Sequence, residues 1–183
     1  MNLIYKKLIR PLLFQLDAEH AHDLACRFLK VTEKSSLARK CISLASYAEY
    51  QSCNVFGLSF PNSLGLAAGM DKNGTFPKTF SSLGFGHVEI GTITPKAQSG
   101  NPKPRLFRYP KYNALVNRMG FNNDGAEAVV SRIAKFYPKE KRSTPLGINI
   151  GKGKDTPIEQ AHNDYISCLN KCYNQADYIT VNI

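Results

Sequence analysis

Four polar side chains stand at or beside the ends of four short runs of strand length, and their types suit a flat, hydrogen-bonding ligand. They are Lys72, Thr92, Asn149 and Asn182, beside the runs 64–68, 88–91, 146–150 and 178–183. An asparagine is unfavourable at a strand end unless the donors and acceptors of its amide find partners. Two such amides with a hydroxyl and an ammonium predict a site for a planar heterocycle. The alternative is that each asparagine caps the turn after its strand.

The first of these strand ends is rich in small residues. The stretch 64–74 reads Leu-Gly-Leu-Ala-Ala-Gly-Met-Asp-Lys-Asn-Gly, and its candidate ligand-binding residues are Ala68, Gly69, Met70, Asp71 and Lys72. Residues with little or no side chain allow a flat ligand to lie against the backbone. Lys72 comes at the carboxyl end of the strand, where barrel and open-sheet enzymes place their chemistry. A tight strand-to-helix turn with a solvated lysine is an equally open interpretation.

A second group of candidates lies in the long Pro/Gly-rich segment after the second strand. The stretch 117–123 reads Asn-Arg-Met-Gly-Phe-Asn-Asn, and its first five residues are Asn117, Arg118, Met119, Gly120 and Phe121. Several amides, a guanidinium and flexible backbone in one loop suit an anionic, amide-rich small molecule. An ordinary surface loop is rarely so dense in these groups.

The elements that must position these residues alternate between strand and helix. A small β-ribbon is predicted at 54–60, strands at 64–68, 88–91, 146–150 and 178–183, and helices at 76–83, 124–137 and 156–175. This order is typical of a parallel α/β sheet or barrel. A (β/α)8 barrel takes about 250 residues, and four strands with three helices are half of one. We therefore expect either a parallel α/β sheet or a (β/α)8 barrel of the TIM type that is truncated to about its first half in the fourth strand.

The first 50 residues are predicted to form a helical extension ahead of this α/β unit at 51–183. Helices are expected at 2–16, 18–33 and 35–46, with a kink or restart at Pro11 and a cap from Asp17. Short basic amphipathic helices suit docking on an anionic membrane surface. The other interpretation is that they pack on the main domain and their lysines are merely solvated.

Composition excludes several other classes of protein. The chain has 183 residues, 43% hydrophobic and 21% charged, which is ordinary for a globular protein and argues against disorder. The net charge of +10 raises nucleic-acid binding as a third hypothesis, but the basic stretch 96–118 lacks the arginine and aromatic ladder expected for single-strand stacking. Five cysteines without a C-x-x-C pair predict reduced thiols and no metal site. No apolar run approaches the ~18 residues of a membrane span.

Taken together, the motifs resemble the quinone-linked (class 2) dihydroorotate dehydrogenases over essentially the whole chain. The resemblance is carried by the stretches 64–74 and 117–123 quoted above, by Gly-Phe-Gly-His-Val-Glu-Ile-Gly-Thr-Ile-Thr-Pro at 84–95, by Gly-Asn-Pro-Lys-Pro-Arg-Leu-Phe-Arg at 100–108 and by Gly-Ile-Asn-Ile-Gly-Lys at 147–152. The segment Leu-Phe-Gln-Leu-Asp-Ala-Glu-His-Ala-His at 13–22 matches the helical extension that the cytosolic class 1 relatives lack.

The resemblance implies an FMN-containing barrel enzyme that oxidises (S)-dihydroorotate to orotate in pyrimidine synthesis. Electrons would pass to a membrane quinone, and the protein would lie peripherally on the cytoplasmic side of the inner membrane. The flavin would be lined by Ala68 to Lys72, Thr92, Asn149 and Asn182. The substrate would be held by Lys72, Asn117 to Phe121 and Asn182. His22 and Arg108 match positions that line the quinone tunnel of this family, which favours membrane docking for the N-terminal helices.

One departure from the family pattern bears on activity. The serine that removes the substrate proton in class 2 enzymes follows the Asn-Ile of the fourth strand, and this chain ends at Ile183. The phosphate-binding loops expected after strands seven and eight of a barrel are also absent from the sequence. No catalytic base is therefore assigned among these residues. The alternative function is a catalytically inactive fragment that acts at most as a membrane-associating module.

Overall fold

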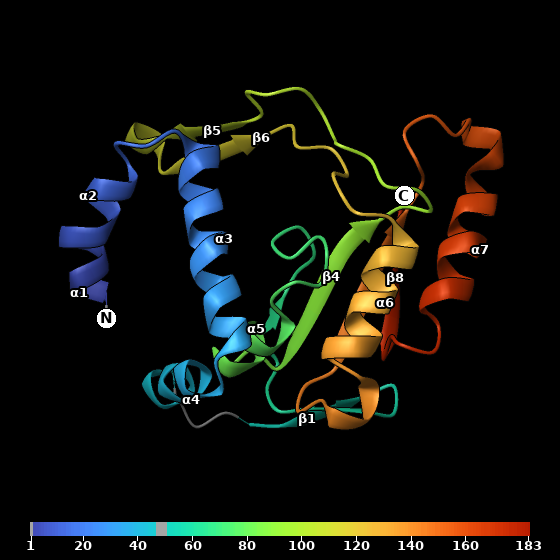
Figure 1. Cartoon of the computed structure of the whole chain (residues 1–183), viewed down its shortest axis with the longest axis horizontal. Coiled ribbons are helices and arrows are strands. Elements are labelled where there is room, and N and C mark those ends of the chain that lie inside the picture. The colour runs from blue at the N-terminus through green and yellow to red at the C-terminus, as the bar shows by residue number, and fades with distance from the viewer. Residues whose placement is uncertain (1, 47–50) are drawn as a thin grey trace.

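A four-stranded parallel sheet forms the centre of the protein (Figure 1). The computed structural model describes residues 2–46 and 51–183. The strand order is β3-β4-β7-β8, and the strands are β3 (Gly65–Leu66), β4 (His87–Ile93), β7 (Leu146–Gly151) and β8 (Tyr178–Asn182). Because neighbouring strands are parallel, their carboxyl ends meet at one edge of the sheet.

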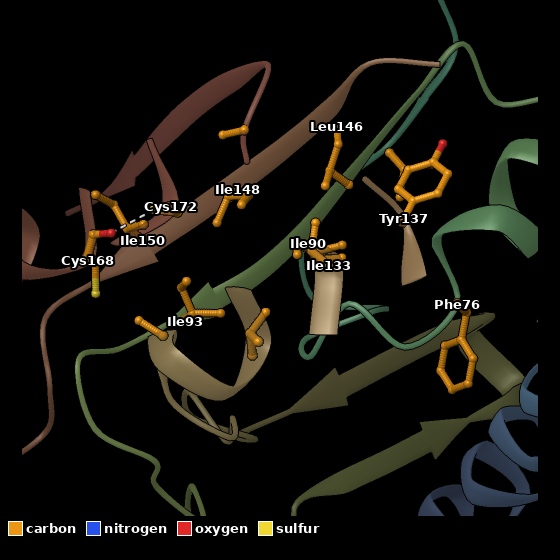
Figure 2. Close-up of a cluster of buried hydrophobic side chains, with 14 of the residues drawn as sticks. Phe76, Ile90, Ile93, Ile133, Tyr137, Leu146, Ile148, Ile150, Cys168 and Cys172 are labelled. Atoms are coloured by element: carbon orange, nitrogen blue, oxygen red, sulfur yellow. Dashed lines mark hydrogen bonds between the residues drawn. The ribbon is translucent and has the colours of Figure 1, made fainter. Parts of the chain in front are cut away.

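Each of the first three strands is followed by a helix that returns the chain to the start of the next strand. These helices are α5 (Pro77–Ser82), α6 (Ala126–Phe136) and α7 (Ala161–Cys172), the last preceded by a 3-10 turn at Ile158–Gln160. Their apolar side chains pack against Val88, Ile90, Leu146, Ile148 and Ile150 of the sheet (Figure 2). The predicted alternation of strand and helix is therefore confirmed, as an α/β fold with a parallel sheet.

The two faces of the sheet differ sharply in chemistry. In β7, Leu146, Ile148 and Ile150 face the helices, so the residues between them, including Asn149, face the opposite side. The register between β4 and β7 shifts between Ile90 and Ile93. Such a bulge adds one residue to a strand and re-aims the side chains beyond it. Ile93 therefore joins the buried core, while Thr92 shares the opposite face with Asn149.

Two antiparallel hairpins lie at opposite ends of the sheet. The first pairs β1 (Cys53–Val55) with β2 (Leu58–Phe60), close to the predicted ribbon. The second pairs β5 (Leu106–Tyr109) with β6 (Ala114–Asn117) around a 3-10 turn at Pro110–Tyr112, and it lies above the helix α3 in Figure 1. This second hairpin lies within the long segment between β4 and α6, so it carries the candidate loop 117–123 to the sheet.

The N-terminal helices follow the predicted boundaries closely, with one difference before Pro11. The segment consists of α1 (Asn2–Ile4), a π-helical turn (Tyr5–Ile9), α2 (Arg10–Leu13), α3 (Ala18–Lys34) and α4 (Ser36–Ala45). A proline inside a helix has no N–H and its ring clashes with the preceding turn, and a widened turn relieves both problems. Asp17 caps α3 as expected, accepting from the backbone N–H groups of Glu19 and His20 at 2.9 and 3.2 Å.

Helix α3 is attached to the α/β unit at both of its ends. Near its start, the buried Glu19 carboxylate accepts from Nε and Nη2 of Arg105 at 3.1 and 3.0 Å. Burial alone would raise the pKa of Glu19, but the hydrogen bonds and charges of Lys103 and Arg105 outweigh it and hold that pKa below its ordinary value. Near its end, Glu33 accepts from the backbone N–H and hydroxyl of Thr79 at 2.8 Å.

The other face of these helices is apolar and exposed. Large apolar side chains with more than two fifths of their surface exposed include Leu3, Ile4, Leu8, Leu12, Leu24, Phe28, Val31, Leu37 and Leu44. None of the helices in the described part of the chain is both long enough and apolar enough to cross a membrane. Packing on the domain and an exposed apolar surface therefore occur together in this extension.

We expect Arg105→Ala to lower the free energy of unfolding by about 3 kcal/mol, because it leaves the buried Glu19 carboxylate without its main partner. The matched control is Lys103→Ala, which removes an ammonium that is 62% exposed and bonds the same carboxylate at 3.1 Å. That change should cost less than about 1 kcal/mol. Urea unfolding followed by circular dichroism measures both losses. Equal losses would show that the Arg105–Glu19 pair does not hold α3 in place.

Candidate functional site

The strand-end side chains predicted to converge are joined directly by hydrogen bonds. The Thr92 hydroxyl donates to Oδ1 of Asn149 at 2.6 Å. Nδ2 of Asn182 donates to Oγ1 of Thr92 at 3.1 Å and to Oδ1 of Asn149 at 3.4 Å. These residues come from β4, β7 and β8, so the parallel ladder places all three side chains at one edge. Their polar atoms form one network and do not cap separate turns.

Glu89 lies beneath this network, and the sequence analysis did not select it. Its Oε1 accepts from Nδ2 of Asn149 at 2.9 Å. Its Oε2 accepts from the hydroxyls of Tyr178 and Thr180 at 3.2 and 2.9 Å. A carboxylate between the core residues Val88 and Ile90 of a central strand was the available signal, because a charged group there needs dedicated partners.

A cavity of about 420 Å³ lies beside the network and contains Lys72. Its lining includes most of the first candidate group, part of the second and two residues of α3: Gly69, Met70, Asp71, Lys72, Asn117, Met119, His22 and Cys26. Part of each predicted group thus borders one hollow, whereas the side chains of Thr92, Asn149, Asn182 and Arg108 are not among its lining. Residues between positions 22 and 122 of the sequence meet there because α3 and the β5–β6 hairpin pack over the strand ends.

A backbone hydrogen bond joins the wall of the cavity to the strand that carries Thr92. The backbone N–H of Gly69 donates to the carbonyl of Gly91, next to Thr92, at 2.9 Å. Gly69 has a φ of +112°, and a Cβ there would meet no atom within 4 Å, so open space adjoins the backbone. A Cβ on Gly151 would lie 2.6 Å from Thr92 and 3.0 Å from the Phe121 ring. The candidate loop therefore packs directly over the strand ends.

Lys72 carries the positive charge of the cavity. Its Nζ lies 3.4 Å from the carbonyl oxygen of Gly120, which ties the strand end to the loop. Burial lowers the pKa of Lys72, and the positive charge of Arg105 lowers it further. A partly desolvated ammonium gains more from a bound anion than a solvated one does. The site is therefore suited to an anionic ligand.

Asn122 also lines the cavity and was not selected as a site residue. Its Oδ1 is buried and has no hydrogen-bond partner among the described residues. A buried acceptor left unpaired costs free energy, which a ligand N–H can recover. Its neighbour Asn123 has a structural role, since its amide bonds the backbone of Thr94 and Gly125. A heterocycle with N–H and carbonyl edges, such as the isoalloxazine of a flavin or a pyrimidine, fits this set of groups.

Three other predicted residues do not line the cavity, and two of them have side-chain partners outside it. The Arg118 guanidinium donates to the carbonyl of Pro104 at 2.9 and 3.2 Å. Arg108 donates to the carbonyl oxygens of Leu13, at 3.1 Å, and Leu16, and borders a separate cavity of about 430 Å³. Ala68 lies in the turn after β3, which is shorter than predicted because the chain leaves the ladder after Leu66.

A larger cavity, of about 550 Å³, lies between α3, α5 and α6. Its lining includes the basic side chains Lys30, Lys34, Arg39, Lys78 and Arg132. None of the predicted site residues borders it within the described parts of the chain. Since convergent polar groups mark a site better than volume does, we place the candidate site at the smaller cavity by the strand ends.

Asp71 supports the site from beneath. Its carboxylate is almost fully buried and accepts from the backbone N–H groups of Thr75 and Phe76, both at 2.8 Å. Burial raises the pKa of Asp71 to about 6, although these two bonds act in the opposite direction. The side chain of Asp71 is thus used in hydrogen bonds to the turn before α5. The part of Asp71 that adjoins the cavity is its backbone.

The raised pKa of Asp71 predicts a specific pH dependence. A group whose pKa rises from 3.8 to about 6 on folding stabilises the protein fully below pH 3.8, and this contribution is lost as the pH rises through 6. The full change is about 3 kcal/mol. The free energy of unfolding of the natural protein, minus that of Asp71→Asn, should therefore fall between pH 4 and pH 7. Urea titrations across this range measure the difference, and a constant or rising value contradicts the assignment.

Comparison with known proteins places this chain in one family. A sequence model described as dihydroorotate dehydrogenase matches residues 50–183. A relative named dihydroorotate dehydrogenase (quinone) from Stenotrophomonas maltophilia is 54% identical over 176 residues, covering 96% of this chain and 48% of the relative. A relative of the same name from Acinetobacter baylyi is 51% identical over 178 residues, with coverage of 96% and 50%.

A solved structure gives the same result. The crystal structure of DHODH from Eimeria tenella in complex with ferulenol matches with a TM-score of 0.75 and 40% identity, covering 91% of this chain and 43% of that one. The chain thus spans about half the length of the curated relatives it matches. Together with the parallel sheet and its shared strand edge, these matches show that the chain belongs to the dihydroorotate dehydrogenase family.

Proposed function

We propose that the polypeptide containing these residues oxidises (S)-dihydroorotate to orotate, with FMN as redox carrier and a membrane quinone as electron acceptor, in de novo pyrimidine synthesis. The observation that carries this proposal is the meeting of Lys72, Asn117 and His22 around one cavity that adjoins the strand-end amides. The relatives named above carry the quinone-dependent name, which supports the choice of acceptor.

FMN would be held by the strand ends. The backbone from Ala68 to Lys72 would lie against one face of the ring, with open space at Gly69. Thr92, Asn149 and Asn182 would offer hydrogen bonds to its edge, and the unpaired acceptor of Asn122 fits an N–H group. When bound, FMN supplies the two-electron acceptor that no amino-acid side chain provides. The side chains and backbone of this chain would bind and orient the FMN, and they would exclude water from its ring.

The substrate would be held by Lys72, Asn182 and the loop from Asn117 to Phe121. Dihydroorotate and orotate are anions with a carboxylate and imide edges, so amides with one ammonium match their chemistry. The ammonium of Lys72 would also stabilise negative charge that develops beside it during the reaction. We assign no general base among the described residues.

The N-terminal residues 1–50 would form a membrane-docking and quinone-access unit, with 51–183 as part of the FMN-binding barrel. The exposed apolar faces of α1, α2, α3 and α4 support contact with the headgroup layer of an anionic membrane. His22 borders the main cavity, and Arg108 fixes the end of α2 at the separate cavity. A quinone would therefore reach the site between these helices, at the cytoplasmic side of the inner membrane.

The alternative is that the 183-residue chain is a catalytically inactive module that only associates with membranes. The observation that favours it is the half-length match to the relatives, together with the four strands present here of the eight in a (β/α)8 barrel. The visible spectrum of the purified chain separates the two. A bound flavin that bleaches on addition of dihydroorotate supports activity of this chain, and a colourless protein that still sediments with anionic vesicles supports the alternative. Salt-sensitive binding to nucleic acid would support neither.

In the natural polypeptide that contains these residues, Lys72→Ala should slow the reduction of bound flavin by dihydroorotate about a hundredfold, because the transition state loses the ammonium that borders the cavity. Asn117→Ala should slow it about tenfold through one lost hydrogen bond. Stopped-flow absorbance of the flavin measures both rates. Lys96→Ala removes an exposed lysine just after β4 and serves as the control, with an unchanged rate. A rate for Lys72→Ala equal to that of the control contradicts the proposed role.

Arg108→Ala should separate the two half-reactions. The guanidinium holds the carbonyls of Leu13 and Leu16 and stacks on the Phe14 ring, 4.6 Å from its centroid. Its loss should loosen the end of α2 and reduce electron transfer to a quinone in anionic vesicles at least tenfold. Flavin reduction by dihydroorotate should change less than twofold.

The matched control is Lys111→Ala, which removes one cation from the same hairpin without a bond to α2. Both half-reactions should be unchanged in it. Equal losses of the two half-reactions in Arg108→Ala would refute a role in quinone access.

A further inference from the structure

We propose that Glu89 is a positioning residue that fixes the donor–acceptor direction of the strand-end amides, so that the carbonyl oxygen of Asn182 faces the ligand. The inference deepens the proposed function and rests on it for the identity of that ligand. It starts from the three groups that donate hydrogen bonds to the Glu89 carboxylate, and from the polar atoms of the network that these bonds leave free for other partners.

Glu89 acts only as an acceptor. The amide Nδ2 of Asn149 and the hydroxyls of Tyr178 and Thr180 all lie within 3.2 Å of its two oxygens. Burial raises the pKa of Tyr178, and the charge of Glu89 and its hydrogen bond raise it further, so the phenol keeps its proton and donates. A carboxylate offers no proton in return. The direction of every bond at this end of the network is therefore set by charge.

That direction passes along the network one residue at a time. Because Nδ2 of Asn149 must point at Glu89, Oδ1 of Asn149 must point at Thr92 and Asn182. The Thr92 hydroxyl then donates to Asn149, and its lone pair is left to accept from Nδ2 of Asn182. With its nitrogen used in this way, Asn182 has only Oδ1 left. That oxygen has no hydrogen-bond partner within the described part of the chain.

The consequence is that Oδ1 of Asn182 is a fixed hydrogen-bond acceptor at the carboxyl end of the strands. A ligand must bring an N–H group to Asn182, as an imide edge does, and a ligand with only a carbonyl there is rejected because two acceptors would face each other. Glu89 itself precedes Thr92 by three residues and acts through Asn149. Without the carboxylate, both directions of the network satisfy the same number of bonds.

The decisive comparison is Glu89→Gln with Tyr178→Phe in the natural, flavin-loaded polypeptide. The glutamine keeps the size of the side chain and the number of contacts but removes the fixed direction. The phenylalanine removes one bond to Glu89 but leaves an acceptor-only carboxylate. Titration with orotate, followed by the perturbed flavin spectrum, should give about tenfold weaker binding for Glu89→Gln and less than twofold for Tyr178→Phe. Glu127→Gln, on the exposed side of α6, should match the natural protein.

Equal losses in Glu89→Gln and Tyr178→Phe would show that the cluster only stabilises the fold, and an unchanged affinity in Glu89→Gln would overturn the inference. Glu89→Asp restores an acceptor-only group on a shorter stem, so its affinity for orotate should lie nearer the natural value than that of Glu89→Gln. The free energy of unfolding of each variant, measured in urea, identifies losses that come from folding alone.

A ligand-free measurement keeps this inference separate from the proposed function. In the 183-residue chain, the side-chain amide resonances of Asn149 and Asn182 should shift or double in Glu89→Gln and stay single in Tyr178→Phe. Unchanged amide resonances in Glu89→Gln overturn the inference whether or not flavin is bound. If instead the natural polypeptide binds neither FMN nor orotate, the proposed function fails while the direction of the network can still be read from these amides.

Discussion

The parallel ladder between β4, β7 and β8 is the constraint on which the rest of the structure depends. Its register sets Asn149 opposite Thr180 and Gly151 opposite Asn182, so polar side chains from distant parts of the sequence lie within bonding distance. The apolar face of the same strands holds this register in place, because a slip of one residue would turn Ile148 and Ile150 away from the helices. The candidate site and the hydrophobic core thus lie on the two faces of the same sheet.

Helix α3 extends this arrangement beyond the sheet. Two carboxylates on one side of the helix, Glu19 and Glu33, bond Arg105 and the start of α5. These contacts bring His22 to the cavity and leave the opposite side of the helix apolar and exposed. The two interpretations of the N-terminal helices that the sequence left open are therefore compatible. A helix can pack on the domain with one face and present the other to a membrane.

Much of this could be predicted from residue types and spacing. Strand ends with Thr92, Asn149 and Asn182 were predictable because amides at such places need partners, and the cap at Asp17 follows a local rule. Glu89 was missed because its partners Tyr178 and Thr180 lie about 90 residues away in the chain. Asn122 was missed because only the packed loop shows that its oxygen is unpaired. The length of β3 depended on where the chain leaves the ladder, which no local pattern sets.

The bulge in β4 divides the strand into two zones with different tolerance to change. Residues before the bulge, such as Glu89 and Ile90, are paired in regular register with the neighbouring strand. Thr92 lies past the register shift, so the direction of its side chain is partly independent of that pairing. Substitutions at the end of the strand can therefore change the groups presented to a ligand, while the register of the residues before the bulge stays the same. The two residues beyond the register shift thus have different roles, since Thr92 belongs to the strand-end network and Ile93 to the core.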